Sequence, residues 1–165
     1  NAILIRAYYY TGEWDANAID WYLRLTQPAD VTARKQELEE QARGQRSFWR
    51  FLNRNGFKVV RKPVRIQRTS DGRISPKADL DLELAIDMLS LADKCEKQIL
   101  VSGDGDFVPL VEYLIGSGRQ VEVIAFGRST SAKLKEAADD FIDMSADPKK
   151  FTIPIKKRKQ KIVKK

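Results

Sequence analysis

The stretch Ile99–Ile115, ILVSGDGDFVPLVEYLI, decides the fold of this chain. It opens on the apolar run Ile99–Val101, which is typical of a buried strand. Apolar side chains then recur at the spacing of one helical face, at Phe107, Leu110, Val111, Leu114 and Ile115. Two carboxylates, those of Asp104 and Asp106, lie in the turn between the predicted strand and the predicted helix. In an open α/β sheet that position is the carboxyl edge, where ligands bind.

The two aspartates of this turn have different expected roles. Asp106 is placed as the N-cap of the helix, where its carboxylate would accept a hydrogen bond from the Val108 amide. A helix has only one N-cap, so Asp104, which lies between two glycines, is left without a structural role. Two carboxylates this close repel each other unless a cation lies between them. Oxygen ligands suit Mg²⁺ or Mn²⁺. The turn therefore indicates a divalent cation site, with a purely structural role as the alternative.

The composition is that of an ordinary globular domain, with 165 residues, 42% hydrophobic and 32% charged. No apolar run approaches the ~20 residues of a membrane span, and no signal peptide is visible. The single Cys95 cannot form an internal disulfide, which favours a reducing, cytoplasmic location. Histidine is absent, which excludes Ser-His-Asp and Cys-His catalysis and histidine-ligated zinc. Catalysis by this chain would have to use carboxylates, lysines, hydroxyls and bound metal.

The net charge of +7 comes from the C-terminal segment. Nine of the 30 basic residues fall between Lys149 and Lys165, a segment without acidic residues, so the remainder carries 21 basic against 23 acidic residues. The domain itself is expected to span residues 1–146 and the basic tail residues 147–165. Within the tail, the candidate nucleic-acid-binding residues are Lys156, Lys157, Arg158 and Lys159. A solubilising or localising tail is the alternative.

The rest of the chain predicts strands that alternate with helices. Strands are expected at Ala2–Tyr10 (ended by Thr11-Gly12), Phe57–Ile66, Gln98–Val101, Gln120–Phe126 and Phe141–Met144. Helices are expected at Asp15–Leu25, from Val31 to an Asn55-Gly56 stop, at Leu80–Ala92, and from a Ser129–Ser131 cap to Ala138. Asp71-Gly72 favours a hairpin-like turn within Gln67–Lys77. This alternation argues for a parallel sheet covered on both faces.

A second acidic group surrounds the predicted helix Leu80–Ala92. Asp79, Asp81 and Glu83 could simply complement the helix dipole. Asp87 shares a stripe with apolar residues, where an unpaired charge would be costly. It either meets a cation or turns to the edge of the stripe and caps a neighbouring loop.

Four motifs, in order and spacing, resemble the NYN domain family and in particular its LabA-like branch, whose fold is related to PIN-domain nucleases. They are Lys77–Asp81 (KADLD), Leu84–Asp87 (LAID), Val101–Leu110 (VSGDGDFVPL) and Ala137–Ile142 (AADDFI), within a match from Arg6 to about Ser145. The resemblance implies a three-layer PIN-like (Rossmann-like) α/β fold with a mainly parallel sheet.

The resemblance also implies a metal-dependent ribonuclease, in which a water activated by Mg²⁺ or Mn²⁺ hydrolyses the phosphodiester bond of RNA. Carried over by motif, Asp81, Asp104 and Asp106 would be catalytic metal ligands, and Asp87 a further ligand. Lys77 and Ser102 would position phosphate or ligands, or are merely a solvated lysine and a turn hydroxyl. The competing class is a non-catalytic RNA-binding or regulatory PIN-like module. A homodimer or a protein partner is left open, and no membrane partner is expected.

Three further features bear on this interpretation. The family's first strand ends in an aspartate, in a motif like F-I-D-G-x-N, and nothing similar occurs here. We therefore expect the chain to lack a central strand, a loss that would divide the sheet into halves. Asp79-Leu-Asp81 weakly resembles the D-x-D motif of haloacid-dehalogenase-like phosphatases. That motif lies at the end of a buried strand, whereas here it lies at the start of a predicted helix. The aromatic segment Trp14–Tyr22 either stacks bases or packs on the domain.

Deletion of residues 149–165 tests the tail. If all nine cations contacted single-stranded RNA, log K would fall with log salt at a slope of about −6, at ~0.7 per contact, and we expect about half of that slope. The truncated protein should therefore bind RNA more weakly at low salt, with cleavage at saturating RNA unchanged. Binding measured across a salt series decides this, and equal slopes for the two proteins would show that the tail does not touch RNA.

Overall fold

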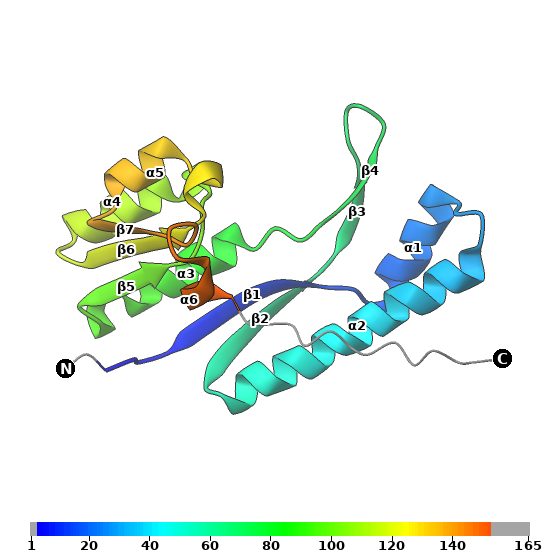
Figure 1. Cartoon of the computed structure of the whole chain (residues 1–165), viewed down its shortest axis with the longest axis horizontal. Helices are drawn as coiled ribbons and strands as arrows, with labels where there is room; N and C mark the ends of the chain where they lie inside the picture. The colour runs from blue at the N-terminus through cyan, green and yellow to red at the C-terminus, as the bar shows by residue number, and fades with distance from the viewer. Residues whose placement is uncertain (1–2, 153–165) are drawn as a thin grey trace. The chain divides into compact units, whose positions relative to one another are not determined.

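The computed structural model describes residues 3–152, shown as ribbons in Figure 1. The chain divides into two compact units, of which the first ends at Asp87 and the second begins at Met88. None of the helices in the described part of the chain is both long and apolar enough to cross a membrane.

The first unit is built on two parallel strands joined through two helices. Its elements are β1 (Ala7–Glu13), α1 (Ala16–Thr26), α2 (Val31–Arg54), β2 (Phe57–Pro63), β3 (Arg65–Arg68) and β4 (Ile74–Lys77), followed by α3 (Asp81–Leu91), which continues into the second unit. β1 pairs with β2 from Ala7 opposite Phe57 to Glu13 opposite Pro63. The long helix α2 runs alongside β2 (Figure 1). This is the predicted strand–helix–strand order.

Both helices of the first unit start at capping aspartates. The Asp15 carboxylate accepts a hydrogen bond from the Ala18 amide at 2.7 Å, and the Asp30 carboxylate accepts one from the Ala33 amide at 2.9 Å. Ile19 and Leu23 of α1 pack on Leu38 of α2, and Trp14 and Tyr22 close over this cluster. The aromatic segment Trp14–Tyr22 therefore packs on the domain, which is one of the two roles expected from the sequence.

β1 begins and ends later than predicted. The strand runs from Ala7 to Glu13, so Thr11-Gly12 does not end it. A Cβ at Gly12 would lie 2.8 Å from Ala78 Cβ and 2.9 Å from Val64 Cγ2. The glycine is therefore needed because neighbouring side chains leave no room, and its presence does not mark a turn.

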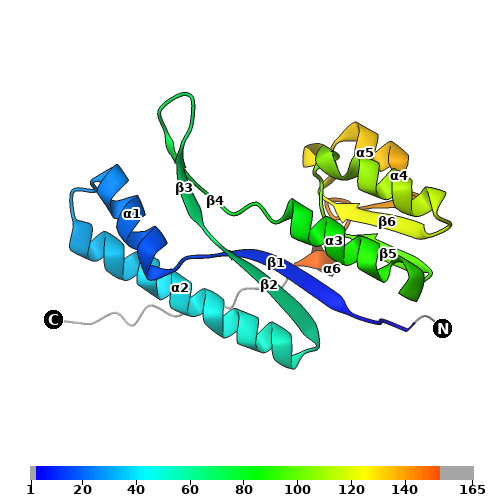
Figure 2. The same ribbon diagram turned by 180° about the vertical axis from the view of Figure 1, so that it is seen from behind.

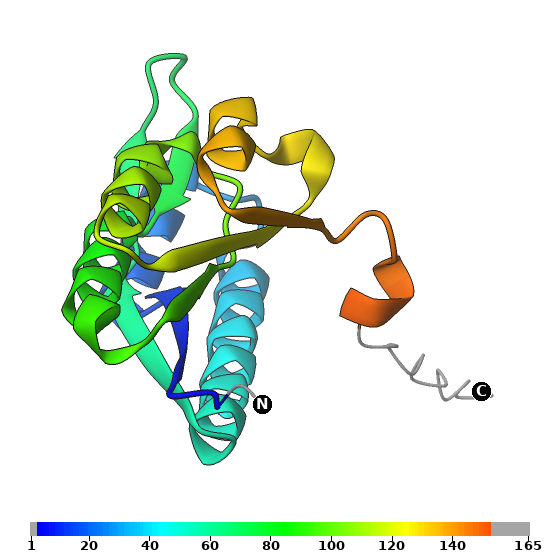
Figure 3. The same cartoon turned by 90° about the vertical axis from the view of Figure 1, so that its left-hand side faces the viewer.

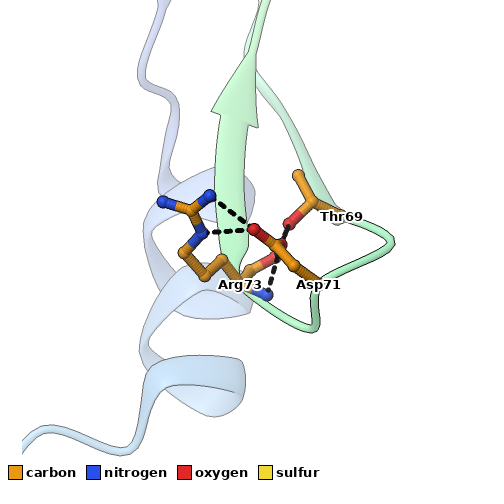
Figure 4. A network of polar contacts seen from close by, with 3 residues as sticks. All are labelled: Thr69, Asp71 and Arg73. Carbon is orange, nitrogen blue, oxygen red and sulfur yellow. Dashed lines mark hydrogen bonds and ion pairs between the residues drawn. The ribbon is translucent and has the colours of Figure 1, made fainter.

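β3 and β4 form the predicted hairpin, which pairs from Arg65 opposite Lys77 to Arg68 opposite Ile74. Figure 4 shows the contacts at its tip. The Asp71 carboxylate accepts hydrogen bonds from the Thr69 hydroxyl and from Arg73 Nε, the latter at 2.6 Å. The Arg73 guanidinium and the Thr69 hydroxyl lower the pKa of Asp71 to about 2. The ionised carboxylate thus holds the tip of the turn closed.

The second unit is a three-stranded parallel sheet with helices. Its elements are η1 (Ala92–Lys94), β5 (Lys97–Leu100), η2 (Gly105–Phe107), α4 (Val108–Gly116), β6 (Gln120–Ala125), η3 (Gly127–Ser129), α5 (Ala132–Ala137), β7 (Asp140–Asp143) and α6 (Pro148–Phe151), where η marks a short 3₁₀ helix. The strand order is β5-β6-β7. α4 and α5 lie side by side on one face of this sheet (Figure 2). The chain continues from β7 into α6 (Figure 3).

The core of the second unit lies between the sheet and these two helices. Its fully buried side chains, all at 0% exposure, are Val111, Leu114, Val121, Val123 and Leu134. In β5, Leu100 joins this core, but Ile99 is 53% exposed. The sequence predicts that this strand is buried on both faces. Within the second unit only one face is covered, because α4 and α5 both pack on that face.

The five parallel strands of the described chain fall into two sheets, β1-β2 and β5-β6-β7. Alternating strands and helices in mainly parallel pairing place the chain in the mixed α/β class.

Candidate functional site

The segment Ser102–Asp106, which we call the acidic turn, connects β5 to η2. The Asp104 amide donates a hydrogen bond to the Ser102 hydroxyl at 3.2 Å. The Asp104 carboxylate in turn accepts a hydrogen bond from the Asp106 amide at 3.0 Å. Asp104 is thus the N-cap of η2, and the turn is held by its own side chains.

This geometry corrects the prediction for the two aspartates. Asp106 does not cap the helix, because the Val108 amide donates to the Gly105 carbonyl instead and α4 has no side-chain cap. A 3₁₀ turn inserted between strand and helix moves the cap two residues back, to Asp104. Asp104 therefore has a structural role, and the surplus carboxylate is that of Asp106. Within residues 3–152 the exposed Asp106 carboxylate has no hydrogen-bond or ion-pair partner.

The loop that follows β6 packs directly against the acidic turn. The Ser131 amide donates to the Gly103 carbonyl at 3.0 Å. A Cβ at Gly103 would lie 3.2 Å from Thr130 Cα, and one at Gly105 would lie 2.8 Å from Ser131 Oγ. A side chain at either glycine would therefore force the two closely packed loops to shift.

Together the two loops form a shallow hollow of about 660 Å³ at the carboxyl ends of β5 and β6. Its lining is small and polar and consists of Ser102, Gly103, Asp104, Gly105, Ser129 and Ser131. Such a surface offers hydroxyl and carboxylate oxygens and no apolar side chain. It can accept a hydrated ion or a polar group, as expected at this edge of a parallel sheet.

Asp143, at the carboxyl end of β7, secures the loop after β6, and sequence reasoning missed it. Its carboxylate accepts hydrogen bonds from the Gly127 amide at 2.9 Å and the Ser145 amide at 2.8 Å. These amides, that of Gly127 above all, hold the pKa of Asp143 below its ordinary value. A Cβ at Gly127 would lie 2.2 Å from Asp143 Oδ2. The available signal was an aspartate near the end of the predicted strand Phe141–Met144.

In the first unit, Asp87 lies among protein partners. The Tyr10 hydroxyl donates to Asp87 Oδ2 at 3.0 Å, and the Lys58 ammonium lies 3.3 Å from Asp87 Oδ1. Burial, followed by the contact with Asp87, raises the pKa of Tyr10. The charge that required compensation on an apolar stripe thus receives it from a tyrosine and a lysine. The assignment of Asp87 as a metal ligand stays a prediction.

The start of α3 is held by Asp79. Its carboxylate contacts the Lys77 ammonium at 3.3 Å and accepts a hydrogen bond from the Asp81 amide at 3.4 Å. Lys77 and the Asp81 amide lower the pKa of Asp79. Asp79 therefore has the structural role of a residue at a helix start. Asp81, the first residue of α3, and the exposed Lys77 keep their predicted functional roles as predictions.

The donors of the acidic turn fit a hard divalent cation in their chemistry. Asp104 and Asp106 supply carboxylate oxygens, and Mg²⁺ is commonly held by one or two carboxylates with water and substrate phosphate completing its shell. Within neither unit do the described residues gather three or more acidic or cysteine side chains around one point. The turn thus offers the oxygen chemistry for Mg²⁺ or Mn²⁺, but the second unit does not supply a complete protein ligand set.

The fold and this edge define a class of protein: a mainly parallel α/β domain with carboxylates exposed after a strand. The chain belongs to the NYN domain family, whose model matches residues 3–145. The NYN domain falls in the PIN-like nuclease superfamily, and NYN domains generally bind nucleic acid and depend on divalent metals.

Two relatives are similar to this chain. The low amplitude and bright protein LabA of Synechococcus elongatus is 28% identical over 127 residues, which cover 76% of this chain and 61% of LabA. A crystal structure of a protein of unknown function from Vibrio parahaemolyticus has 38% identity and a TM-score of 0.52, covering 61% of this chain and 60% of that one. The chain thus spans about three-fifths of each relative. These matches support the LabA-like assignment and the three-layer PIN-like α/β fold.

The tail residues Lys156, Lys157, Arg158 and Lys159, predicted to bind nucleic acid, lie outside the described residues.

Two substitutions of Asp104 separate its capping role from metal binding. Asp104→Ala should lower the free energy of unfolding by about 1 kcal/mol, because the Asp106 amide loses its acceptor. Asp104→Asn keeps an acceptor oxygen and should unfold at or slightly above the wild-type temperature, because it removes a like charge beside Asp106. In both variants the rise in melting temperature caused by Mn²⁺ should shrink. A wild-type Mn²⁺ response in Asp104→Asn would count against Asp104 as a ligand.

Asp143 should make stability depend on acid pH. Because folding lowers its pKa from the ordinary 3.8, the ionised carboxylate stabilises the fold above that pH. This contribution is lost as the pH falls through the folded-state pKa. The melting-temperature difference between wild type and Asp143→Asn should therefore be constant from about pH 7 to pH 5 and shrink below about pH 4. A difference that is the same at every pH would show that this carboxylate does not hold the loop.

Proposed function

We propose that this chain is the nuclease domain of a Mg²⁺- or Mn²⁺-dependent ribonuclease that acts in the cytoplasm. The observation that carries the proposal is the exposed Asp106 carboxylate, without a protein partner in the described chain, beside Asp104 at the carboxyl edge of a parallel sheet. Membership of the NYN family supports RNA as the substrate class. Hydrolysis of a phosphodiester bond is the reaction that such a site serves in this superfamily.

Each residue of the acidic turn has a defined part in this proposal. Asp106 would bind the cation with a carboxylate that no protein contact occupies. Asp104 uses one oxygen for the Asp106 amide, and the carboxylate retains lone pairs for a second partner. Ser102 positions Asp104 by accepting its amide hydrogen bond. The bound cation would supply an activated water and would neutralise charge on the phosphate.

Two residues of the first unit belong to the proposal on the strength of the family motifs. By those motifs, Asp81 would be a metal ligand and Lys77 would bind the substrate phosphate. Lys77 is 60% exposed in its side chain and shares its charge with Asp79, so it is accessible to an anionic ligand. Asp87, already neutralised by Lys58, would act as an outer ligand at most.

A non-catalytic RNA-binding module is the second candidate. It is favoured by the structural roles of the acidic residues, since Asp104 caps η2 and Asp87 binds Tyr10 and Lys58. These contacts would preserve both aspartates even in a domain that had lost catalysis.

Cleavage of a labelled RNA mixture by the full-length protein tests the proposal. After removal of metal with chelator, wild type should cleave only when Mg²⁺ or Mn²⁺ is added. Asp106→Asn should reduce cleavage by at least about 100-fold, since even residues that only orient metal ligands cost 10–100-fold. Asp93→Asn is the matched control, because this side chain is 97% exposed and lies outside the acidic turn.

The two candidates give opposite results. Cleavage that requires metal and is lost in Asp106→Asn but kept in Asp93→Asn supports the ribonuclease. RNA binding without cleavage by any of the three proteins supports the binding module. Cleavage that persists in chelator would contradict a metal-dependent mechanism.

A further inference from the structure

A second, chemically opposite surface lies in the first unit, between α2 and β2. It is a pocket of about 500 Å³ whose lining includes Arg43, Arg46, Arg50, Arg61, Trp49 and Asn53. We call it the arginine pocket. No acidic side chain lines it. Four guanidinium groups line one concavity, which makes it strongly cationic. The chain without its basic tail is slightly acidic as a whole.

The sequence places these arginines on one surface through two periodicities. Arg43, Arg46 and Arg50 follow the spacing i, i+3, i+7, which puts them on one face of α2. Arg61 follows Val59 by two residues on β2, and both line the pocket from the same side of that strand. The pocket is therefore a consequence of helix and strand pattern together.

The floor of the pocket is Trp49, which is 4% exposed. The Arg61 guanidinium lies 5.4 Å from the centroid of its ring. Stacking of a nucleic-acid base needs an open aromatic face. Since Trp49 is buried beneath Arg61, the pocket offers charge and hydrogen-bond donors and no such face.

The charges of the pocket are only partly compensated. Arg61 lies 3.5 Å from Glu13, and Arg43 lies 3.8 Å from Glu40. Arg50 donates to the Ser47 hydroxyl at 3.1 Å. Neither Arg46 nor Arg50 has an acidic partner among residues 3–152. Two guanidinium groups are thus left to bind an external anion.

The geometry selects among anions. A guanidinium presents a planar fork that matches phosphate oxygens with two hydrogen bonds. Arg43 and Arg50 are seven residues apart on α2, or about 10 Å along the helix axis, which a linear polyanion can follow but a single phosphate cannot.

We propose that the arginine pocket binds the phosphodiester backbone of single-stranded RNA independently of base sequence. This inference rests on the proposed function for its choice of RNA. It does not require cleavage or metal binding.

The test measures binding of a fluorescent 12-nucleotide oligouridylate to the 165-residue chain by anisotropy across a salt series, with chelator present. The variant Arg46→Gln/Arg50→Gln removes two cations from the pocket. Loss of two contacts should reduce the slope of log K against log salt by about 1.4, at ~0.7 per contact. The affinity ratio of wild type to variant should therefore fall about sevenfold between 50 and 200 mM salt.

The control variant is Arg24→Gln/Arg68→Gln, which removes the same charge from the same unit outside the pocket. It should keep a salt slope near that of wild type. Circular dichroism melting of both variants establishes that each is folded. Identical slopes for the two double variants would overturn the proposal.

Two further binding measurements identify which chemical group of the ligand the pocket recognises. An oligouridylate with an uncharged methylphosphonate backbone should bind wild type and the pocket variant equally, and an oligoadenylate should behave as oligouridylate does. If polyglutamate competed as well as RNA of equal charge, the pocket would be a site for acidic protein segments and the proposal would fail. Asp106→Asn should retain the full salt slope, so loss of cleavage and loss of RNA binding are separable.

Discussion

The candidate site depends on one close approach, between the acidic turn after β5 and the loop after β6. Gly103 and Gly105 leave room for Thr130 and Ser131, and the Ser131 amide bonds to the Gly103 carbonyl. The loop after β6 is also attached to β7, because the Asp143 carboxylate accepts a hydrogen bond from the Gly127 amide. Larger side chains at these glycines would push the loops apart. The exposed carboxylates of the turn are therefore held in place by loop packing and backbone hydrogen bonds within the second unit.

The strand–turn–helix motif at Ile99–Ile115 could be predicted because its signals are local: an apolar strand, glycines, then one helical face. The same holds for the hairpin turn at Asp71. The role of Asp104 could not be predicted, because the inserted 3₁₀ turn depends on how Phe107 is buried against the core. The extent of β1 was also missed, since the need for Gly12 comes from Val64 and Ala78, far along the chain.

The candidate site was predicted in its residues more fully than in its contacts. Sequence motifs pointed to Asp104 and Asp106 but not to Asp143, whose two amide partners come from the β6 loop and from the chain just after β7. The arginine pocket was missed altogether. Its four arginines are ordinary helix and strand surface residues in sequence, and only the packing of α2 on β2 brings Arg61 to the others. Surfaces assembled from distant segments need the fold before they can be recognised.

In the proposed ribonuclease, the acidic turn would bind the metal ion and the arginine pocket would bind the RNA. Carboxylate oxygens suit a hard cation, whereas guanidinium groups suit the phosphates of the substrate. A surface that binds metal through carboxylates repels a polyanion, so a separate cationic surface is needed to retain RNA. The NYN family membership and this separation of charge support the same proposal from different observations.

Binding of Mn²⁺ followed by nuclear magnetic resonance of the ¹⁵N-labelled protein tests the central claim most directly, because this paramagnetic ion broadens the signals of nearby amides. The account predicts that substoichiometric Mn²⁺ first broadens the amides of the acidic turn, Ser102–Asp106, together with those of Ser129–Ser131, which line the same hollow. In Asp106→Asn the same broadening should require a higher Mn²⁺ concentration. Broadening centred elsewhere in the chain, or none near the acidic turn, would contradict the account.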